Sequence, residues 1–163
     1  MSWDVLVQNF EGHPPPVDEL KEGLPLGKAE TVRKKIDKHL PGVDWSDGQN
    51  GFYEADAFSI EFSISDEQPV TCLTLAVRGG GAAFAALKSF AVPNKWSLFD
   101  CSESDFLDLD SEAASGFEAF QEFRERAIGP KNRGTRPTVR QANRKKEAPK
   151  KKAANPKAKR RRS

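Results

Sequence analysis

The 163-residue chain contains few of the residues that build disulfide scaffolds, membrane spans or metal sites. Two cysteines are too few for a disulfide-stapled domain. No apolar run reaches the ~18 residues that a membrane-spanning helix needs. No basic, apolar leader follows Met1, so we do not expect secretion. These absences favour a cytoplasmic protein.

Charge is divided unevenly along the chain, although the net charge is only +2. Residues 1–129 contain 11 Lys and Arg against 23 Asp and Glu, a net charge of −12. Residues 130–163 contain 15 Lys and Arg against one acidic residue, a net charge of +14, and no aromatic residue. Such a segment cannot bury enough apolar surface to offset its chain entropy. We therefore expect an acidic globular domain over 1–129 and a disordered basic tail over 130–163.

Apolar residues in the acidic domain recur with periods of both 2 and about 3.6, which is typical of mixed strands and helices. The strands are expected at residues 3–10, 51–55, 58–65 and 70–78, with a further edge strand from 96–99 or 106–109. The helices are expected at residues 28–40 and 82–91, and from Ser111 or Ser115 to Ile128. The proline-rich residues 14–27 should form an extended loop, and Pro93 should end the second helix.

These elements, in the order β-α-β-β-β-α-β-α, predict an α+β fold. An antiparallel sheet of about four or five strands should pack one face against two or three helices. Apolar positions on the inward faces should form the core: Val32, Ile36, Phe58, Ile60, Phe62, Ile64, Leu73, Leu75, Val77, Leu87, Phe90, Phe117 and Phe120.

Several motifs in residues 1–128 resemble a family of small bacterial proteins of unassigned function. They are MSWDVLVQ at 1–8, PLG at 25–27, PGVDWSD at 41–47, FSIEF at 58–62 and VRGGG at 77–81, with an aromatic helix near 117–128. The resemblance excludes the tail. It implies a bacterial cytoplasmic domain and no particular chemistry.

The tail carries the strongest chemical signal in the chain. Closely spaced Lys and Arg bind phosphate backbones by releasing counterions, without reading sequence. The absence of aromatic residues argues against stacking on single-stranded bases. The alternatives are a solvated tail and a tail that contacts its own acidic domain. The predicted polyanion-binding residues are Arg144, Lys145, Lys146, Lys150, Lys151, Lys152, Lys157, Lys159, Arg160, Arg161 and Arg162.

Three residues of the domain are candidates for a partner surface. Trp45 lies in a polar loop, where a large aromatic side chain either anchors a partner or packs onto the core. Glu61 and Arg78 are expected on the polar side of neighbouring strands, where a cross-strand ion pair is the ordinary outcome. The glycines at 79–81 are a weak candidate for an anion site, and a tight turn with positive φ explains them better.

The sequence contains few side chains with the spacing that a metal site or a catalytic site requires. The acidic residues at 100–110 lack the ligand ladder and central glycine of a calcium loop, so a solvated acidic face is expected. His13, His39, Cys72 and Cys101 lack zinc-ligand spacing. We therefore expect no metal, no cofactor and no catalytic residue, and an enzyme using a cleft near Arg78 is the weakest hypothesis.

Two hypotheses for function remain. The first is a non-enzymatic adaptor whose acidic domain meets a protein partner and whose tail holds nucleic acid, which would associate it with the nucleoid. The second is an immunity-like or antitoxin-like domain that binds a basic protein, with an incidental tail. A charge of −12 on the domain would steer a basic partner in either case.

Overall fold

The computed structural model describes residues 1–20 and 22–128. Its elements in chain order are β1 (Trp3–Asn9), the 3-10 helix η1 (Val17–Glu19), α1 (Ala29–His39), β2 (Asn50–Glu54), β3 (Phe58–Ile64), β4 (Leu73–Gly79), α2 (Ala83–Asn94), β5 (Trp96–Asp100), β6 (Asp105–Phe106) and α3 (Ser115–Ile128). The strands form one antiparallel sheet in the order β2-β3-β4-β1-β5-β6. The protein is therefore an α+β fold, as predicted.

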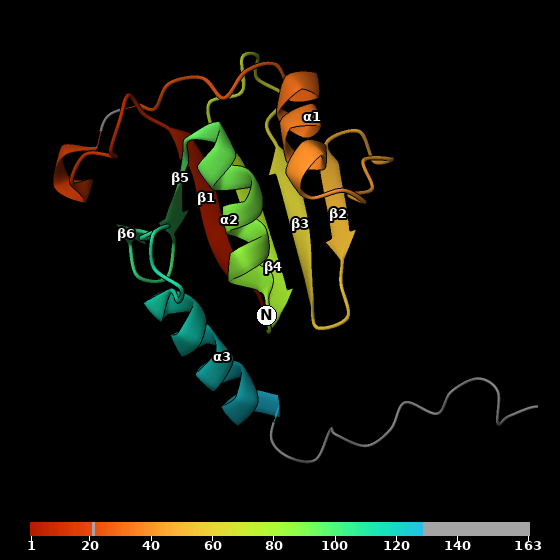
Figure 1. Cartoon of the computed structure of the whole chain (residues 1–163), viewed down its shortest axis with the longest axis vertical. Helices are drawn as coiled ribbons and strands as arrows, with labels where there is room; N and C mark the ends of the chain where they lie inside the picture. The colour runs from red at the N-terminus through yellow and green to blue at the C-terminus, as the bar shows by residue number, and fades with distance from the viewer. Residues whose placement is uncertain (21, 129–163) are drawn as a thin grey trace, which may run out of the picture. The chain divides into compact units, whose positions relative to one another are not determined.

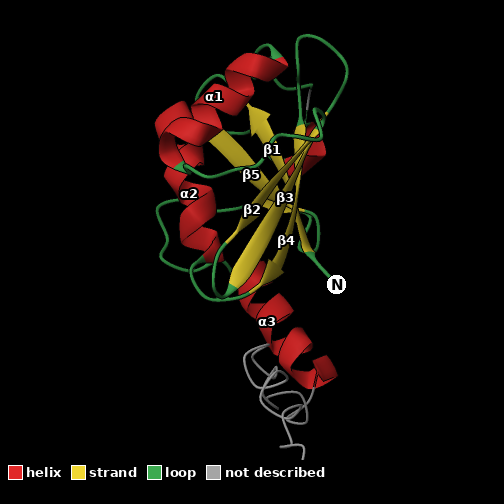
Figure 2. Cartoon of the chain, turned by 90° about the vertical axis from the view of Figure 1, so that its right-hand side faces the viewer, coloured by secondary structure: helices red, strands yellow, loops and turns green. Residues whose placement is uncertain are grey.

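The helices are distributed unequally around the sheet (Figures 1 and 2). α1 and α2 lie side by side on one face, and α3 lies beyond the end of α2. Within residues 1–20 and 22–128, no helix covers the opposite face. This arrangement follows from the strict alternation in the strands, which sends apolar side chains to one face and polar side chains to the other.

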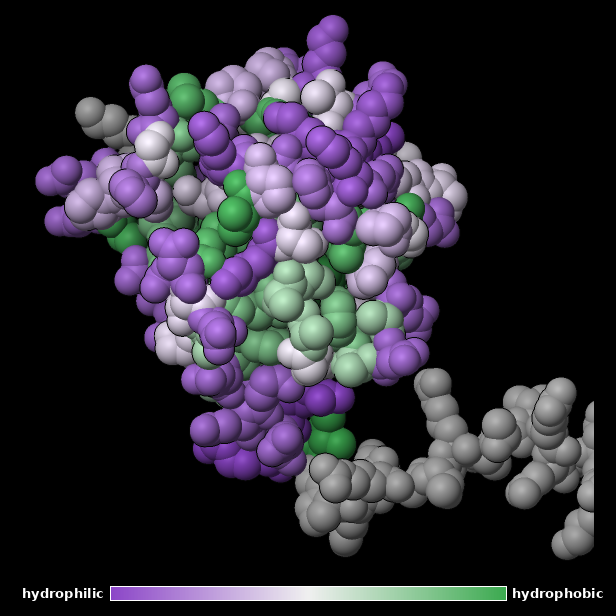
Figure 3. Space-filling view, viewed as in Figure 1, coloured by the Kyte–Doolittle hydropathy of each residue, from purple (hydrophilic) through white to green (hydrophobic). Residues whose placement is uncertain are grey.

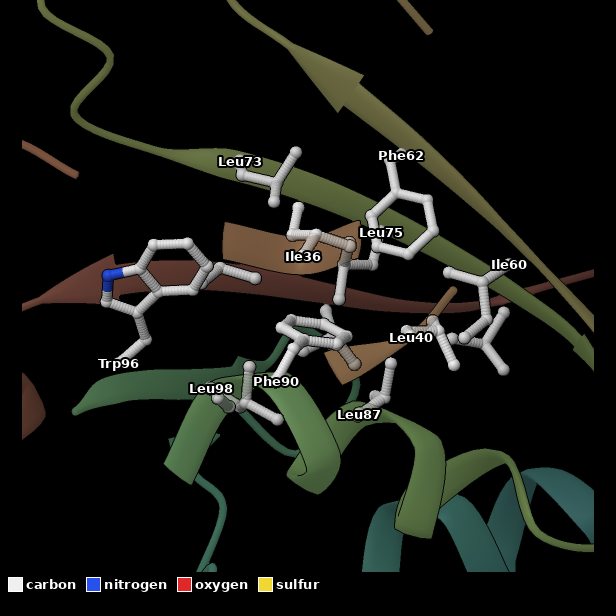
Figure 4. Close-up of a cluster of buried hydrophobic side chains, with 14 of the residues drawn as sticks. Ile36, Leu40, Ile60, Phe62, Leu73, Leu75, Leu87, Phe90, Trp96 and Leu98 are labelled. Carbon is white, nitrogen blue, oxygen red and sulfur yellow. The ribbon is translucent and has the colours of Figure 1, made fainter. Parts of the chain in front are cut away.

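The core lies between the sheet and the two helices. Residue pairing places Val5 of β1 opposite Leu75 of β4, and Val7 of β1 opposite Leu98 of β5, so that buried positions meet across the sheet. Figure 4 shows side chains of α1 and α2 meeting those of the strands, and the ring centroids of Phe62 and Phe90 are 5.9 Å apart. Of the predicted core residues, only Phe58 is half-buried rather than buried.

The sheet has one more strand than predicted. An edge strand was expected from 96–99 or 106–109, and both segments contribute: β5 pairs with β1 on one side and with the two-residue β6, which forms the edge, on the other. The alternation of Trp96, Leu98 and an acidic residue in β5 shows which face is buried, but periodicity carries no information about a strand's neighbours. Local pattern therefore identified these segments as strands but not their order in the sheet.

α2 continues past the residue expected to end it. Pro93 lies inside its last turn, where the proline ring removes one hydrogen bond but its fixed φ still fits the helix. The helix ends when Lys95 adopts a left-handed conformation with a φ of 56°. The predicted strand at 70–78 likewise begins later, at Leu73, since Val70 instead bridges to Gly27 in the proline-rich loop.

α3 is held on the sheet by its first turns. Gly116 lies so close to Asp100 that a β-carbon at this position would overlap the Oδ2 atom of that carboxylate. The next residue, Phe117, packs with its ring centroid 4.9 Å from that of Trp3 in β1. Only glycine permits this approach between the helix and the carboxylate.

We predict that Gly116→Ala destabilises the domain. The clash with the Asp100 carboxylate should cost about 1–3 kcal/mol as overpacking, which outweighs the gain of up to about 1 kcal/mol in helix propensity. Denaturant unfolding measures the difference. Ser115→Ala, at the exposed neighbouring position, serves as the control and should change stability little. An unchanged or higher stability of Gly116→Ala would mean that α3 is not seated on Asp100.

Candidate functional site

A large hollow lies between the start of α2 and α3. This hollow, the α2–α3 groove, has a volume of about 740 Å³. Its residues are Gly81, Ala82, Phe84, Ala85, Glu112, Ala113, Ala114, Phe117, Glu118, Gln121, Glu122 and Glu125. A second hollow of about 520 Å³ shares Ala85 and Glu112 with it and extends along α2 to Val92 and Pro93.

The floor of the groove is apolar. The buried rings of Phe84 and Phe117 lie beneath it, and the exposed Ala82 and Ala85 line it. Figure 3 shows apolar surface over the lower part of α2, next to hydrophilic surface over α3. A helix that is apolar on every side is normally buried. α2 buries Leu87 and Phe90 against the sheet, yet its outer face still presents alanines, Val92 and Pro93 to solvent.

The rim of the groove is acidic. It consists of four exposed glutamates: Glu112, Glu118, Glu122 and Glu125. Among residues 1–20 and 22–128, Arg126 is the only cation within salt-bridge distance of this rim, with its guanidinium 3.8 Å from Glu122. Lys88 lines the neighbouring second hollow, where it donates to the Ser111 carbonyl at 2.6 Å and lies over the Phe84 ring at the edge of the floor. An apolar floor with a negative rim favours a positively charged, amphipathic ligand.

The glycine turn at 79–81 positions one wall of the groove. Gly79 and Gly81 have φ values of 96° and 64°, as expected for a tight turn. The Gln121 side chain of α3 donates to the Gly79 carbonyl at 2.7 Å and lies close against Gly80. The Gly80 N–H donates to the Ala57 carbonyl. Because Gln121 and Ala57 occupy this turn, it serves to seat α3 and leaves little room for an anion.

Asp100 corrects the expectation of a uniformly solvated acidic face. Its side chain is buried, with 1 % of its surface exposed. Oδ2 accepts from the Trp3 indole N–H at 2.8 Å, and Oδ1 accepts from the Ser102 hydroxyl at 2.6 Å and the Ser102 N–H at 2.8 Å. A buried carboxylate requires such partners to offset its desolvation. The alternation of Trp96, Leu98 and Asp100 along one strand was the available signal for its burial.

The three candidate partner residues lie in two separate places. Trp45 is half-buried and packs against the core, with its ring centroid 5.6 Å from that of Phe62 and its indole N–H donating to Asp37 at 2.9 Å. Glu61 and Arg78 lie on the helix-free face of the sheet and form an ion pair at 2.9 Å. Trp45 and the ion pair are thus not brought together. The predicted polyanion-binding residues between Arg144 and Arg162 lie outside the described residues.

The cysteines are free thiols without an activating environment. Burial raises the pKa of the Cys72 thiol. Burial, followed by the nearby carboxylates of Asp4 and Asp100, raises the pKa of Cys101. Nucleophilic cysteines require the opposite shift. No group of three or more metal-ligating side chains is present in the described residues.

Comparison with known proteins adds no family to this description. No protein-family model, curated protein or solved structure matches the chain significantly. Across the described residues, no helix is both long enough and apolar enough to cross a membrane.

Sequence reasoning missed the α2–α3 groove. The rim glutamates come from the segment before α3 and from α3 itself, whereas most of the floor comes from α2. Only the fold brings them together. A signal was present in α2, because alanines, Val92 and Pro93 extend the apolar surface beyond the stripe needed to face the sheet.

We predict that Cys101 alkylates slowly at neutral pH. A raised pKa leaves less thiolate than in free cysteine, whose pKa is about 8.5. In a Cys72→Ser background, the iodoacetamide rate should rise with a midpoint above that value. Asp4→Asn removes one charge that raises the pKa and should lower the midpoint, whereas the remote Asp18→Asn should not. A midpoint at or below that of free cysteine would contradict this environment.

Proposed function

We propose that the protein is a non-enzymatic binding protein with two differently charged parts. The acidic domain engages a basic protein partner, and the basic tail contacts nucleic acid or another polyanion without reading sequence. The observation that carries the proposal is the partition of charge, −12 over residues 1–129 and +14 over 130–163. A cytoplasmic, nucleoid-associated location is part of the proposal.

The geometry of the domain supports the first half of this proposal. The α2–α3 groove combines exposed apolar surface with four glutamates, which is the chemistry that a basic amphipathic surface complements. The domain charge would accelerate encounter with such a partner. The raised pKa of Cys101 and the solvent exposure of His13 offer little support for nucleophilic catalysis.

The composition of the tail supports the second half. Fifteen cations in 34 residues, spaced by Ala, Pro and Asn, provide dense positive charge without side chains that read base edges or stack on bases. Binding of this kind depends on the release of counterions from the phosphate backbone.

A second candidate function assigns binding to the domain alone. An immunity-like or antitoxin-like inhibitor of a basic protein would need only the acidic domain, with the tail as an incidental extension. The location of the α2–α3 groove entirely within the domain favours this alternative. The two candidates differ in whether nucleic-acid binding is a property of the chain.

We predict that deleting residues 130–163 abolishes nucleic-acid binding and leaves the domain folded. Among residues 1–20 and 22–128, every buried core residue lies between Trp3 and Phe120, and the truncated chain keeps all of these. Fluorescence anisotropy with duplex DNA, together with circular dichroism, compares the two chains. Equal DNA binding by the truncated chain, or no binding by either chain, would contradict nucleic-acid binding by the tail. Either result would favour the inhibitor hypothesis.

The salt dependence of binding by the full chain provides a further prediction. The slope of log affinity against log salt should be about −0.9 for each phosphate contacted. If the acidic domain shields part of the tail, the number of contacts should fall well below the 15 cations available. Duplexes of unrelated sequence should bind equally. A slope near zero, or a strong sequence preference, would contradict counterion-driven binding by the tail.

A further inference from the structure

We propose that the α2–α3 groove binds an amphipathic, basic helix of a protein partner. The apolar face of that helix lies on the alanine and phenylalanine floor, and its Lys or Arg side chains lie opposite the rim glutamates. This inference rests on the protein-binding half of the proposed function, and it specifies the surface and the chemistry of the partner.

The outer face of α2 is apolar and exposed to solvent. Ala85, Val92 and Pro93 are exposed on this face, and Val92 retains 51 % of its surface. Scattered apolar residues on a surface need no explanation, but a continuous patch beside a groove marks an interaction site. Here the patch joins the groove through Ala85 and Glu112, which line both hollows.

The shape of the groove suits a helical ligand. One wall is α3, whose 14 residues extend about 21 Å at the usual helical rise. The opposite side is formed by Gly81 and the first turn of α2, which also supplies most of the floor. An apolar floor beside a helix is the kind of surface on which a further helix packs through anchors spaced at i, i+3, i+4 and i+7. The floor offers small alanines, which permit close approach by larger apolar side chains.

The charge of the rim is complementary to that of a basic helix. The rim supplies four carboxylates, and Arg126 is the one described cation within salt-bridge distance of them. An acidic helix would be repelled by this rim, and a neutral helix would leave the carboxylates without partners. On the helix-free face of the sheet, by contrast, Glu61 is already paired with Arg78.

The composition of the tail distinguishes a partner from this chain's own C-terminal segment. Residues 130–163 supply positive charge, but Val139 is their only aliphatic residue larger than alanine. The tail therefore lacks the apolar face that the groove floor would bury. A separate protein with a helix both basic and apolar fits the groove better.

A synthetic peptide tests the proposal with the full chain. The probe is a capped helical peptide of about 14 residues, with leucine at the i, i+3, i+4 and i+7 positions and lysine between them. One control peptide has the same composition in scrambled order, and another replaces every lysine with glutamate. Isothermal titration calorimetry should give saturable binding of the amphipathic lysine peptide, weaker binding of the scrambled peptide and none of the glutamate peptide.

Variants locate the binding. Ala85→Arg fills the floor from an exposed position, and the double variant Glu122→Lys/Glu125→Lys reverses part of the rim. Each of these changes should weaken binding of the amphipathic lysine peptide by at least about tenfold. The matched control Glu11→Lys/Glu67→Lys makes the same change in net charge at exposed positions outside the groove. It should weaken binding by less than about threefold, since it alters only long-range electrostatics. Thermal unfolding checks that all variants keep the fold.

The outcomes separate this inference from the proposed function. Equal weakening by the two double variants, or equal binding of the scrambled peptide, would overturn the groove while leaving a general affinity for basic partners. Absence of any peptide binding would overturn both the groove and the protein-binding half of the function. Anisotropy with duplex DNA measures the tail separately, and the Ala85→Arg variant should leave it unchanged.

Discussion

The buried carboxylate of Asp100 is the contact on which the arrangement of this domain depends. It joins the end of β5 to the Trp3 indole of β1 and to the turn at Ser102, and α3 crosses directly over it at Gly116. A carboxylate removed from water is costly unless its oxygens are hydrogen-bonded, and both oxygens of Asp100 have donors. The same contact fixes how closely α3 approaches, because the helix needs glycine at the crossing point.

The position of α3 in turn creates the binding surface that we propose. Phe117 packs on Trp3, Gln121 donates to the Gly79 carbonyl, and the rest of α3 then presents its glutamates beside the outer face of α2. α2 packs against the sheet through Leu87 and Phe90, and its remaining apolar surface therefore faces the groove and solvent. The apolar floor and the acidic rim therefore come mainly from two helices, whose relative position depends on the close approach of Gly116 to Asp100 together with these two contacts.

The fold class could be predicted from sequence because alternation and helical spacing record which face of each element is buried. Residues 58–64 and 73–79 illustrate this, since each strand matches its predicted face position by position. Neighbour relations were not encoded in the same way: β5 lies between β1 and β6 because of contacts distant in sequence. The hydrogen-bond partners of Asp100 and the α2–α3 groove could not be predicted for the same reason, because both depend on contacts between residues distant in sequence. Trp45, Glu61 and Arg78 were predicted as a possible partner surface, and their contacts within the domain became visible only in the fold.

Peptide-induced changes in the backbone amide spectrum of the full chain reveal where on the domain the peptide binds. Titration of the isotopically labelled protein with the amphipathic lysine peptide should shift the amides of Ala82, Ala85, Glu118 and Glu122 most, because these residues line the α2–α3 groove. The amides of Ser59, Glu61 and Arg78, on the helix-free face of the sheet, should change little. The largest shifts at those sheet residues, or small shifts spread evenly over the acidic domain, would contradict the account.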